Sequence, residues 1–355
     1  MFKILMVQES PCIRNVKTAL MLKEKGHQVD GAVTVSKAAD RLNLKQHKPY
    51  YNEYKIDSYP DLVELGKEYD IVHVHNGPDR LGALAFATGK PVVWDCHDLV
   101  SSLEIEDPRG NDLILEVSLY KGADGVVFAS PGFADYCATT YGSTKAQPLV
   151  SYNLPSRYML YGKKKKLGED YIHIVYAGSL SDKPGNHRNF LDEFKELLSL
   201  FPNVKLHIYP AVSPVTKKDG IGTKMEKHSL QSYADLEKDF GGRVAFYDPV
   251  SPFDLISELS QYDYGWMPFK SQGKFTELFI PNKLYEYTAA GLAIITRKFK
   301  TVDLETQGWN NIILYRSLQE IKELQKPEAP TLGFKYFECQ YKDYLGLYKR
   351  ITSRS

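Results

Sequence analysis

Short apolar runs alternate with helix-like patterns along the whole chain, and the first half holds four of these runs. They are KILMV (3–7), DIVHVH (70–75), PVVWD (91–95) and GVVFA (125–129). Such near-continuous apolar character is typical of strands that are covered on both faces of a parallel sheet. After the first run, Ile13, Val16 and Leu20 fall on one helical face, and Gly26 stands where a helix C-cap is expected. The first half therefore predicts a parallel α/β unit.

The second half repeats this pattern. Its apolar runs are HIVYA (173–177), VKLHIY (204–209), VAFY (244–247), YGWM (264–267) and LAIIT (292–296), with helices expected at 189–200 and 252–261. A segment with proline, glycine and four lysines, 152–170, separates the two halves. The chain ends in a helical stripe that contains Phe337, Tyr341, Tyr344, Leu345 and Tyr348. We therefore expect one domain over 1–160, a second over 161–335 and a terminal helix over 336–355.

Length and composition fit this division. A chain of 355 residues suits two α/β domains of similar size. The formal net charge of +1 gives no overall field that would attract nucleic acid. The four cysteines are far apart and show no zinc-binding spacing, which favours reduced, mostly buried thiols and no metal site. No apolar stretch reaches the roughly 20 residues that a membrane span needs, and the N-terminus does not resemble a signal peptide. We expect a cytoplasmic protein, and Lys163–Lys166 either contact anionic lipid or are simply solvated.

Three familiar phosphate-binding motifs are missing. The loop after the first strand, QESPCIRN, holds no glycine, so a GxGxxG dinucleotide site is not supported. The chain contains no GxxxxGK[ST] motif and no DxD pair for a metal–diphosphate clamp. A phosphate site in this chain would have to use helix N-termini and basic side chains.

Residues that directly follow strands carry the candidate chemistry, because open α/β sheets bind ligands at the carboxyl ends of their strands. The run HIVYA is followed by GSLSDKPGNHRNF, in which Gly178 allows close backbone approach and Lys183 and Arg188 are cationic. This loop either cradles a diphosphate or is a solvated turn. The phrase PNKLYEYTAAG begins a helix at Asn282 and Lys283, whose free amides favour an anion. Glu286 lies one turn later on the same face, where a carboxylate can accept two ribose hydroxyls.

A further candidate lies in the first half. The strand PVVWD ends in CHDL, which places His97 and Asp98 at a strand tip. A single histidine is often structural, but its position after a central strand makes a functional role equally plausible.

Together these phrases resemble the GT-B glycosyltransferases of family 4, also called group 1. The resemblance covers nearly the whole chain and rests on DIVHVHNGP, PVVWDCHDL, GADGVVFASPGFADY, YAGSLSDKPG and PNKLYEYTAAG, of which the last is the most specific. It implies two Rossmann-like domains with parallel sheets that face a central cleft. It also implies that the aromatic C-terminal helix packs back on the N-terminal domain.

The resemblance implies roles for individual residues. His97 and Asp98 would be the catalytic-side residues, with His97 near the donor sugar. The loop FYDPVS (246–251) would flank the nucleobase through main-chain groups. The residues expected on the donor are Gly178, Ser179, Lys183, Arg188, Tyr247, Val250, Pro281, Asn282, Lys283, Leu284 and Glu286. Arg14, His75, Asn76 and Arg80 are expected on the acceptor side. Of the cations there, Arg14, Lys17 and Arg80 would either receive an anionic acceptor or be ordinary surface charges.

Two positions depart from the family pattern. A glutamate is common eight residues before the ribose-binding one, but this chain has Leu278 there and Glu277 beside it. The arginine that commonly follows the glycine of the basic loop is Ser179. These departures concern contacts with the sugar and the diphosphate more than the fold.

The resulting prediction is a transferase that moves a sugar from a UDP- or GDP-sugar to a hydroxyl of a carbohydrate or a lipid-linked acceptor, in glycan or polysaccharide assembly. We expect no metal and no cofactor. The family favours retention of the anomeric configuration, and the chain shows no obvious carboxylate pair for a covalent intermediate. Two alternatives remain open at this point: a nucleotide-sugar 2-epimerase, and a non-catalytic protein that binds nucleotide-sugar and supports a partner transferase.

Overall fold

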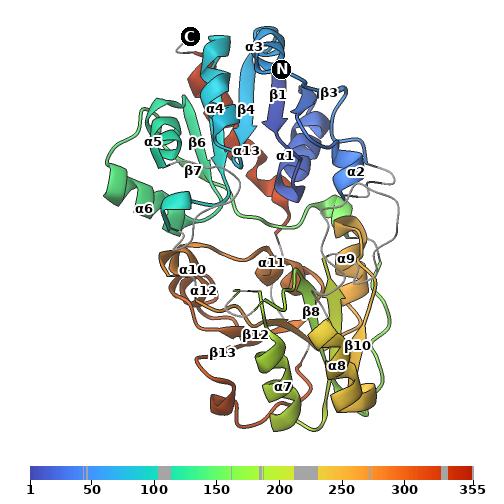
Figure 1. Ribbon diagram of the computed structural model, residues 1–355. Helices are drawn as coiled ribbons and strands as arrows, with labels where there is room; N and C mark the ends of the chain where they lie inside the picture. The colour runs from blue at the N-terminus through green and yellow to red at the C-terminus, as the bar shows by residue number, and fades with distance from the viewer. Residues whose placement is uncertain are drawn as a thin grey trace. The chain divides into compact units, whose positions relative to one another are not determined.

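The chain folds into two compact units that interleave along the sequence (Figure 1). The computed structural model describes residues 1–42, 44, 47–102, 113–160, 162–183, 186, 188–211, 231–271, 273–328 and 335–353. Unit 1 comprises Met1–Arg157, Gly273–Ile280 and Lys335–Ser355, and unit 2 comprises Tyr158–Gln272 and Pro281–Phe334. The segment Gly273–Ile280 therefore belongs to unit 1, although it lies in the second half of the sequence.

Unit 1 is built on a seven-stranded parallel sheet. The strand order is β3-β2-β1-β4-β5-β6-β7, and every pairing is parallel. The strands are β1 (Lys3–Gln8), β2 (Gln28–Val33), β3 (Glu53–Lys55), β4 (Ile71–His75), β5 (Val92–Cys96), β6 (Gly125–Phe128) and β7 (Leu149–Val150). All residues of β4, β5 and β6 are buried, as strands covered on both faces must be. The four strands predicted for this half are confirmed.

Helices cover this sheet, and two of them begin with a serine N-cap. They are α1 (Ile13–Glu24), α2 (Ala38–Leu42), α3 (Tyr59–Gly66), α4 (Arg80–Ala85), α5 (Leu113–Gly122), α6 (Pro131–Tyr141), α10 (Lys274–Leu278) and α13 (Tyr341–Thr352), with 3₁₀ turns η1 (Phe86–Thr88), η2 (Val100–Ser102) and η6 (Phe337–Gln340). Ser58 and Ser130 accept a backbone N–H in the first turns of α3 and α6. Gly26 follows α1 with φ +85°, which is the left-handed conformation predicted for its C-cap region.

The terminal helix α13 packs within unit 1. Its buried face consists of Tyr344, Leu347, Tyr348 and Ile351. A Cβ on Gly125 of β6 would lie 3.0 Å from Leu347 Cδ1, so the glycine lets this helix approach the sheet closely. The aromatic stripe in the sequence is therefore largely a packing face.

Unit 2 is built on a six-stranded parallel sheet with the order β10-β9-β8-β11-β12-β13. Its strands are β8 (Ile172–Gly178), β9 (Val204–Pro210), β10 (Val244–Phe246), β11 (Tyr264–Met267), β12 (Ala293–Arg297) and β13 (Ile312–Tyr315). The helices are α7 (Leu191–Leu200), α8 (Gln231–Phe240), α9 (Pro252–Leu259), α11 (Asn282–Ala289) and α12 (Lys300–Glu305), with 3₁₀ turns η3 (Arg157–Met159, which begins at the end of unit 1), η4 (Gly241–Arg243) and η5 (Leu318–Glu320). The five strands predicted here are confirmed, and the expectation of two Rossmann-like α/β units holds.

One glycine fixes the position of α11 on this sheet. A Cβ on Gly265 of β11 would lie 2.2 Å from Tyr287 Cγ, so only glycine admits the tyrosine ring at this point. The Tyr287 hydroxyl accepts the backbone N–H of Ala177 at 3.1 Å, near the carboxyl end of β8. Helix α11 is thereby tied to the edge of the sheet from which the β8 loop leaves.

The lysine run near the end of the first half has partners inside unit 2. Lys164 Nζ lies 2.6 Å from Glu258 Oε2, and Lys166 Nζ donates to the carbonyl of Tyr262. Among the described residues, no helix combines the length and the apolar character that crossing a bilayer requires.

Candidate functional site

The carboxyl ends of β1, β4 and β5 meet at the point where the strand order of unit 1 changes direction. Strand β1 pairs with β2 on one side and β4 on the other, so the loops that follow β1 and β4 run away from each other. Such a switch point is where open α/β sheets bind ligands. The residues there are Cys12 after β1, His75 at the end of β4 and His97 after β5.

A buried ion pair forms the base of this region. Arg14 Nε donates to Asp95 Oδ1 at 2.8 Å, and Arg14 Nη1 donates to the Ser151 carbonyl at 2.7 Å. Arg14 is 1% exposed and Asp95 is fully buried. Burial opposes ionisation of Asp95, but the guanidinium and the neighbouring histidines hold the pKa of its carboxyl well below the ordinary value.

Three histidines surround the Asp95 carboxylate. His73 Nε2 lies 3.5 Å from Asp95 Oδ2, and His97 Nε2 lies 3.6 Å from Asp95 Oδ1. His75 Nδ1 is 3.9 Å from Asp95 Oδ2 and 2.9 Å from His97 Nε2. Burial lowers the pKa of His73 and His75, so both imidazoles are neutral at pH 7.

Two tyrosines of the terminal helix α13 also contact this cluster. Tyr348 Oη lies 2.7 Å from His73 Nδ1, and Tyr344 Oη lies 3.4 Å from Asp95 Oδ2. Helix α13 thus places a hydroxyl against Nδ1 of a histidine on the central strand of unit 1, while Nε2 of that ring faces the Asp95 carboxylate.

Contacts with several residues hold His97 in place, while its ring stays partly exposed to solvent. Its side chain is 15% exposed, whereas those of His73 and His75 are fully buried. Its backbone N–H donates to Asn76 Oδ1 at 2.8 Å, and Asn76 Nδ2 donates to the Asp98 carbonyl at 2.6 Å. Its Nδ1 lies 3.6 Å from Cys12 Sγ. Although burial opposes protonation, Cys12 and Asp95 raise the pKa of His97.

Two groups of side chains in this cluster offer metal-ligand atoms within 4.8 Å of one another. One consists of Cys12, His75 and His97, and the other of His73, His75 and Asp95. The sequence analysis did not predict these two groups, because their members come from different strands and loops. The fit to a metal ion is poor, since Arg14 already bonds the only carboxylate and its positive charge would repel a cation.

The residues predicted on the acceptor side differ in their surroundings. Arg14 and His75 are buried in the cluster just described, and Asn76 is 6% exposed. Arg80 is the exposed one, and its Nη2 donates to Glu9 Oε1 at 3.3 Å. Asp98 is partly buried, and its carbonyl rather than its carboxylate holds Asn76. Contact of any of these residues with an acceptor stays a prediction.

Unit 2 brings a lysine against the glycine at the end of β8. A Cβ on Gly178 would lie 2.5 Å from Lys283 Nζ, and Gly178 has φ +154°. The ammonium also lies 5.8 Å from the centre of the Tyr176 ring and 5.7 Å from that of Phe269. Burial lowers the pKa of Lys283, although Glu286 nearby favours the charged form. Among the described residues, no acceptor lies within hydrogen-bond distance of this ammonium.

Lys283 and Glu286 lie on α11, an eight-residue helix that starts without a side-chain cap. Its first residue is Asn282, preceded by Pro281, so the first amides have no side-chain acceptor there. Leu284 is fully buried and anchors the helix, whereas Glu286 is half-buried. This places an ammonium, free amides and a carboxylate on one turn of helix, beside the β8 loop.

The two cations of the β8 loop are both exposed, at different distances from Lys283. Arg188 is near enough to Lys283 to lower the pKa of its ammonium. Lys183 lies on the turn itself, where its carbonyl accepts from Asn186 N at 3.1 Å. The Ser181 N–H donates to the Arg188 carbonyl at 3.0 Å, which closes the loop. Ser179 is half-buried, and its carbonyl accepts from Tyr176 Oη at 2.7 Å.

Tyr247, in the predicted nucleobase loop, stacks on a second tyrosine that the sequence analysis did not single out. The rings of Tyr247, just after β10, and Tyr209, near the end of β9, have centroids 4.5 Å apart. Tyr247 Oη lies 2.9 Å from His207 Nδ1, and His207 Nε2 lies 2.9 Å from His173 Nδ1. Tyr247 is thereby held rigidly, while Val250 is half-buried in the loop that follows.

Leu278, one of the two positions that depart from the family pattern, lies at a contact between two helices of unit 1. Leu278 ends α10 in unit 1, and its carbonyl accepts from the Ser130 hydroxyl at 2.5 Å. A Cβ on Gly132 would lie 2.5 Å from this same carbonyl oxygen. Leu278 therefore contributes through its backbone to the contact between α10 and α6.

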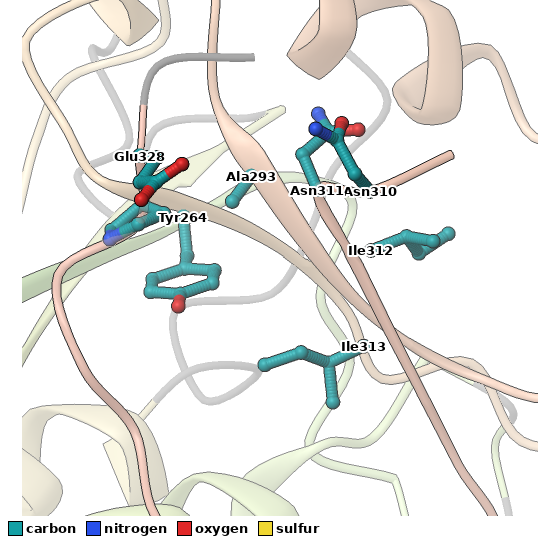
Figure 2. Close-up of a pocket in the computed structure, with 8 residues that line it drawn as sticks. Tyr264, Ala293, Asn310, Asn311, Ile312, Ile313 and Glu328 are labelled. Carbon is teal, nitrogen blue, oxygen red and sulfur yellow. The ribbon is translucent and has the colours of Figure 1, made fainter. Parts of the chain in front are cut away.

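A small cavity lies at the opposite edge of the unit 2 sheet (Figure 2). Its volume is about 220 Å³, and it is lined by Tyr264, Ala293, Asn310, Asn311, Ile312, Ile313, Pro327 and Glu328. Tyr264, Ala293 and Ile312 are the first residues of their strands, so the cavity lies at the amino ends. It is distinct from the carboxyl-end site that contains Gly178 and Lys283.

We expect Gly178→Ala to weaken nucleotide binding and also to lower stability. The new Cβ would lie 2.5 Å from Lys283 Nζ, so the ammonium must move out of the predicted site, and the φ of +154° strains any residue that carries a side chain. The loss of one charged hydrogen bond corresponds to a roughly tenfold higher dissociation constant for the nucleotide. Calorimetric titration measures this. Gly168→Ala is the matched control, because nothing lies within 4 Å of its Cβ position; equal effects of both variants would contradict the prediction.

The fold and part of the sequence match known proteins. Residues 16–153 match the family model described as Glycosyltransferase Family 4. Sucrose-phosphate synthase from Thermosynechococcus elongatus is similar over 100% of this chain and 94% of its own, with 14% identity and a TM-score of 0.65. HepE from Anabaena, in complex with UDP-glucose, is similar over 99% and 93%, with 14% identity and a TM-score of 0.63. AviGT4, a glycosyltransferase involved in avilamycin A biosynthesis, is similar over 100% and 99%, with 11% identity and a TM-score of 0.59.

No curated protein matches the chain in sequence. The structural neighbours confirm the GT-B fold class, and the family model confirms the resemblance to family 4 across most of unit 1. The family-model match over residues 16–153 agrees with the predicted glycosyltransferase, and the solved structures show the likeness in fold.

Proposed function

We propose that this protein transfers a sugar from a nucleoside-diphosphate sugar to a hydroxyl acceptor without a metal ion. The observation that carries the proposal is Lys283, a half-buried ammonium that rests against Gly178 with no hydrogen-bond acceptor among the described residues. A partly desolvated cation without a hydrogen-bond partner is stabilised when an anion completes its site. A diphosphate supplies that anion.

The remaining donor contacts follow from the geometry of α11. The free amides at Asn282 point along the helix axis toward an anion bound at its N-terminus. Arg188 contributes a second charge, and Glu286 accepts ribose hydroxyls from one turn further in. During transfer the leaving diphosphate gains negative charge, which Lys283 and the amides stabilise. This set of donors replaces the metal of other diphosphate sites.

The donor base is the first point to establish, and UDP-glucose is the first donor to try because HepE is similar in fold and holds it. His97 supplies the group from unit 1 that contacts the transferred sugar. We infer that the acceptor is a carbohydrate or lipid-linked hydroxyl and that the anomeric configuration is retained, as the resemblance to family 4 implies.

The test is a thermal unfolding series with UDP, GDP, ADP and CMP, and with UDP-glucose, each with and without EDTA. A ligand present at 100 times its dissociation constant stabilises the fold by about 2.7 kcal/mol. We expect one nucleotide to raise the unfolding temperature, regardless of EDTA. Lys283→Met should abolish the shift, whereas Lys238→Met, which removes an exposed lysine from α8, should leave it unchanged.

Two outcomes would contradict the proposal. A shift that vanishes in EDTA would show that a metal is needed, and no shift with any nucleotide would remove the donor site. NMR of UDP-glucose incubated without acceptor then separates transfer from epimerisation, because only an epimerase changes the sugar under those conditions.

A further inference from the structure

Cys12 is the partly exposed cysteine of unit 1 that lies beside the Asp95 cluster. Cys96 and Cys137 are buried, and Cys339, near the C-terminal helix, is exposed. Cys12 is the N-cap residue of the twelve-residue helix α1, and its Sγ accepts from the Asn15 N–H at 3.5 Å. Its own N–H donates to Gln8 Oε1 at 2.9 Å, which fixes the loop after β1. The thiol is therefore held in one place at the mouth of the Asp95 cluster.

His97 lies within reach of the thiol as a base, and two other side chains orient this histidine. His97 Nδ1 lies 3.6 Å from Cys12 Sγ. The other ring nitrogen of His97 lies 2.9 Å from His75 Nδ1 and 3.6 Å from Asp95 Oδ1. A nucleophile, a histidine within reach of it and a third group that orients the histidine are the arrangement that activates cysteines in proteins.

The charged and titratable groups around Cys12 come from several elements. They are Arg14 on α1, His75 on β4, Asp95 and His97 at the end of β5, and Tyr50 before β3. Burial opposes ionisation of the thiol, but His97 and the hydrogen bonds from Asn15 and Gln8 lower the pKa of Cys12 to about 7. The nearby Arg14 acts in the same direction, because a positive charge favours the thiolate.

We propose that Cys12 is a reactive thiol and the site at which this protein is covalently modified by soft carbon electrophiles and by peroxides. In an alkylation, His97 takes the thiol proton, the sulfur forms a bond to the electrophilic carbon and the leaving group departs with its electron pair. With a peroxide, the sulfur bonds to one oxygen while the O–O bond breaks. The sulfur is oxidised to a sulfenic acid and the peroxide is reduced to water or an alcohol.

Modification would also change His97. A group on Sγ removes the thiol from Nδ1 of His97 and fills the space in front of the ring. The site is thus placed where one covalent event disturbs the residue proposed to contact the sugar.

The test is alkylation of the full-length protein with iodoacetamide, followed by peptide mass spectrometry, between about pH 5.5 and 9. The protein used carries the substitution Cys339→Ser, so that this exposed cysteine does not compete with Cys12 for the reagent. We expect the labelling rate of Cys12 to reach half its plateau near pH 7, whereas an ordinary thiol does so near about 8.5. In His97→Asn the midpoint should rise by about one pH unit or more.

The pH at which labelling of Cys12 is half-maximal tests the proposal better than the labelling rate at a single pH. A thiol of lower pKa has more thiolate at neutral pH but is intrinsically less nucleophilic, and the two effects partly cancel. A midpoint near 8.5, absence of labelling at Cys12, or a midpoint that His97→Asn leaves unchanged would each overturn the proposal. Should His97→Asn fail to fold, the midpoint in the Cys339→Ser protein still gives the answer. Labelling needs no nucleotide-sugar, so its result is independent of the proposed transfer reaction.

Discussion

His97→Ala is expected to lower the rate of sugar transfer by about 100-fold or more and to leave the affinity for the nucleotide almost unchanged. The imidazole is partly exposed at the carboxyl end of β5 and is oriented by His75 and Asp95. A group held in this way costs no reorganisation when charge develops on the substrate. The proposed nucleotide contacts lie instead in unit 2, around Lys283 and Gly178.

Two measurements on the same preparation separate these effects. Steady-state transfer gives kcat and KM, and calorimetric titration gives the dissociation constant of UDP or whichever nucleotide raises the unfolding temperature. His27→Ala serves as a control, because His27 precedes β2 at the amino edge of the same sheet and bonds Phe2 N through Nδ1. Unchanged turnover in His97→Ala would remove His97 from the reaction, whatever the fate of nucleotide binding.

The strands that sequence patterns predicted share one physical property. Strands β1, β4, β5 and β6 in unit 1 are buried on both faces, so their sequences are almost continuously apolar. Strand β2 was not predicted because QVDGAV mixes Gln28, Asp30 and Gly31 with its apolar residues. Asp30 is nevertheless buried, since it accepts from Tyr69 Oη at 2.8 Å and from Asn52 N at 2.8 Å. Strands β3 and β7 are only three and two residues long, too short for any periodicity.

The candidate site was predictable where its residues lie close together in one sequence motif. Lys283 and Glu286 lie on one helix, and their spacing alone puts them on one face. Gly178 and Lys283 are over 100 residues apart, and only the packing of α11 beside β8 brings them together.

The Asp95 cluster was missed, although the sequence held a signal for it. An aspartate inside the apolar run VVWDC needs a buried partner, because an uncompensated carboxylate in a core is very costly. His73 and His75 alternate with apolar residues in IVHVH, so they share one face of β4. The sequence could not show that Arg14 and Cys12 meet that face, since their place depends on the β1–β4 pairing and on the entry of α1.

The Arg14–Asp95 pair leads to the largest expected effect on stability. Both groups are almost completely buried, and each is the other's main compensating charge. Arg14→Met leaves the Asp95 carboxylate without its cation, and Asp95→Asn leaves the guanidinium without its anion. We expect either single substitution to lower the free energy of unfolding by about 3–5 kcal/mol, measured by urea denaturation at pH 7.

The double variant Arg14→Met/Asp95→Asn distinguishes charge compensation from simple packing. If the penalty comes from an unpaired buried charge, the double variant removes both charges and regains much of the lost stability. If the two single penalties add in the double variant, the pair is not coupled and the interpretation is wrong. Asp30→Asn is the control for replacing a buried aspartate in this unit that has no arginine partner among its hydrogen bonds.

The same pair determines how stability depends on pH. The pKa of Asp95 is lower in the folded protein than in the unfolded chain, so the folded state favours the carboxylate. The stabilisation that the Asp95 carboxylate provides is therefore complete above the pKa of an unfolded aspartate, about 4. It decreases as the pH falls toward the lower pKa of the folded protein. Urea midpoints taken between about pH 6 and 3 should fall less steeply for Arg14→Met/Asp95→Asn than for the native protein. Equal slopes would show that other carboxylates, and not this buried one, govern acid unfolding.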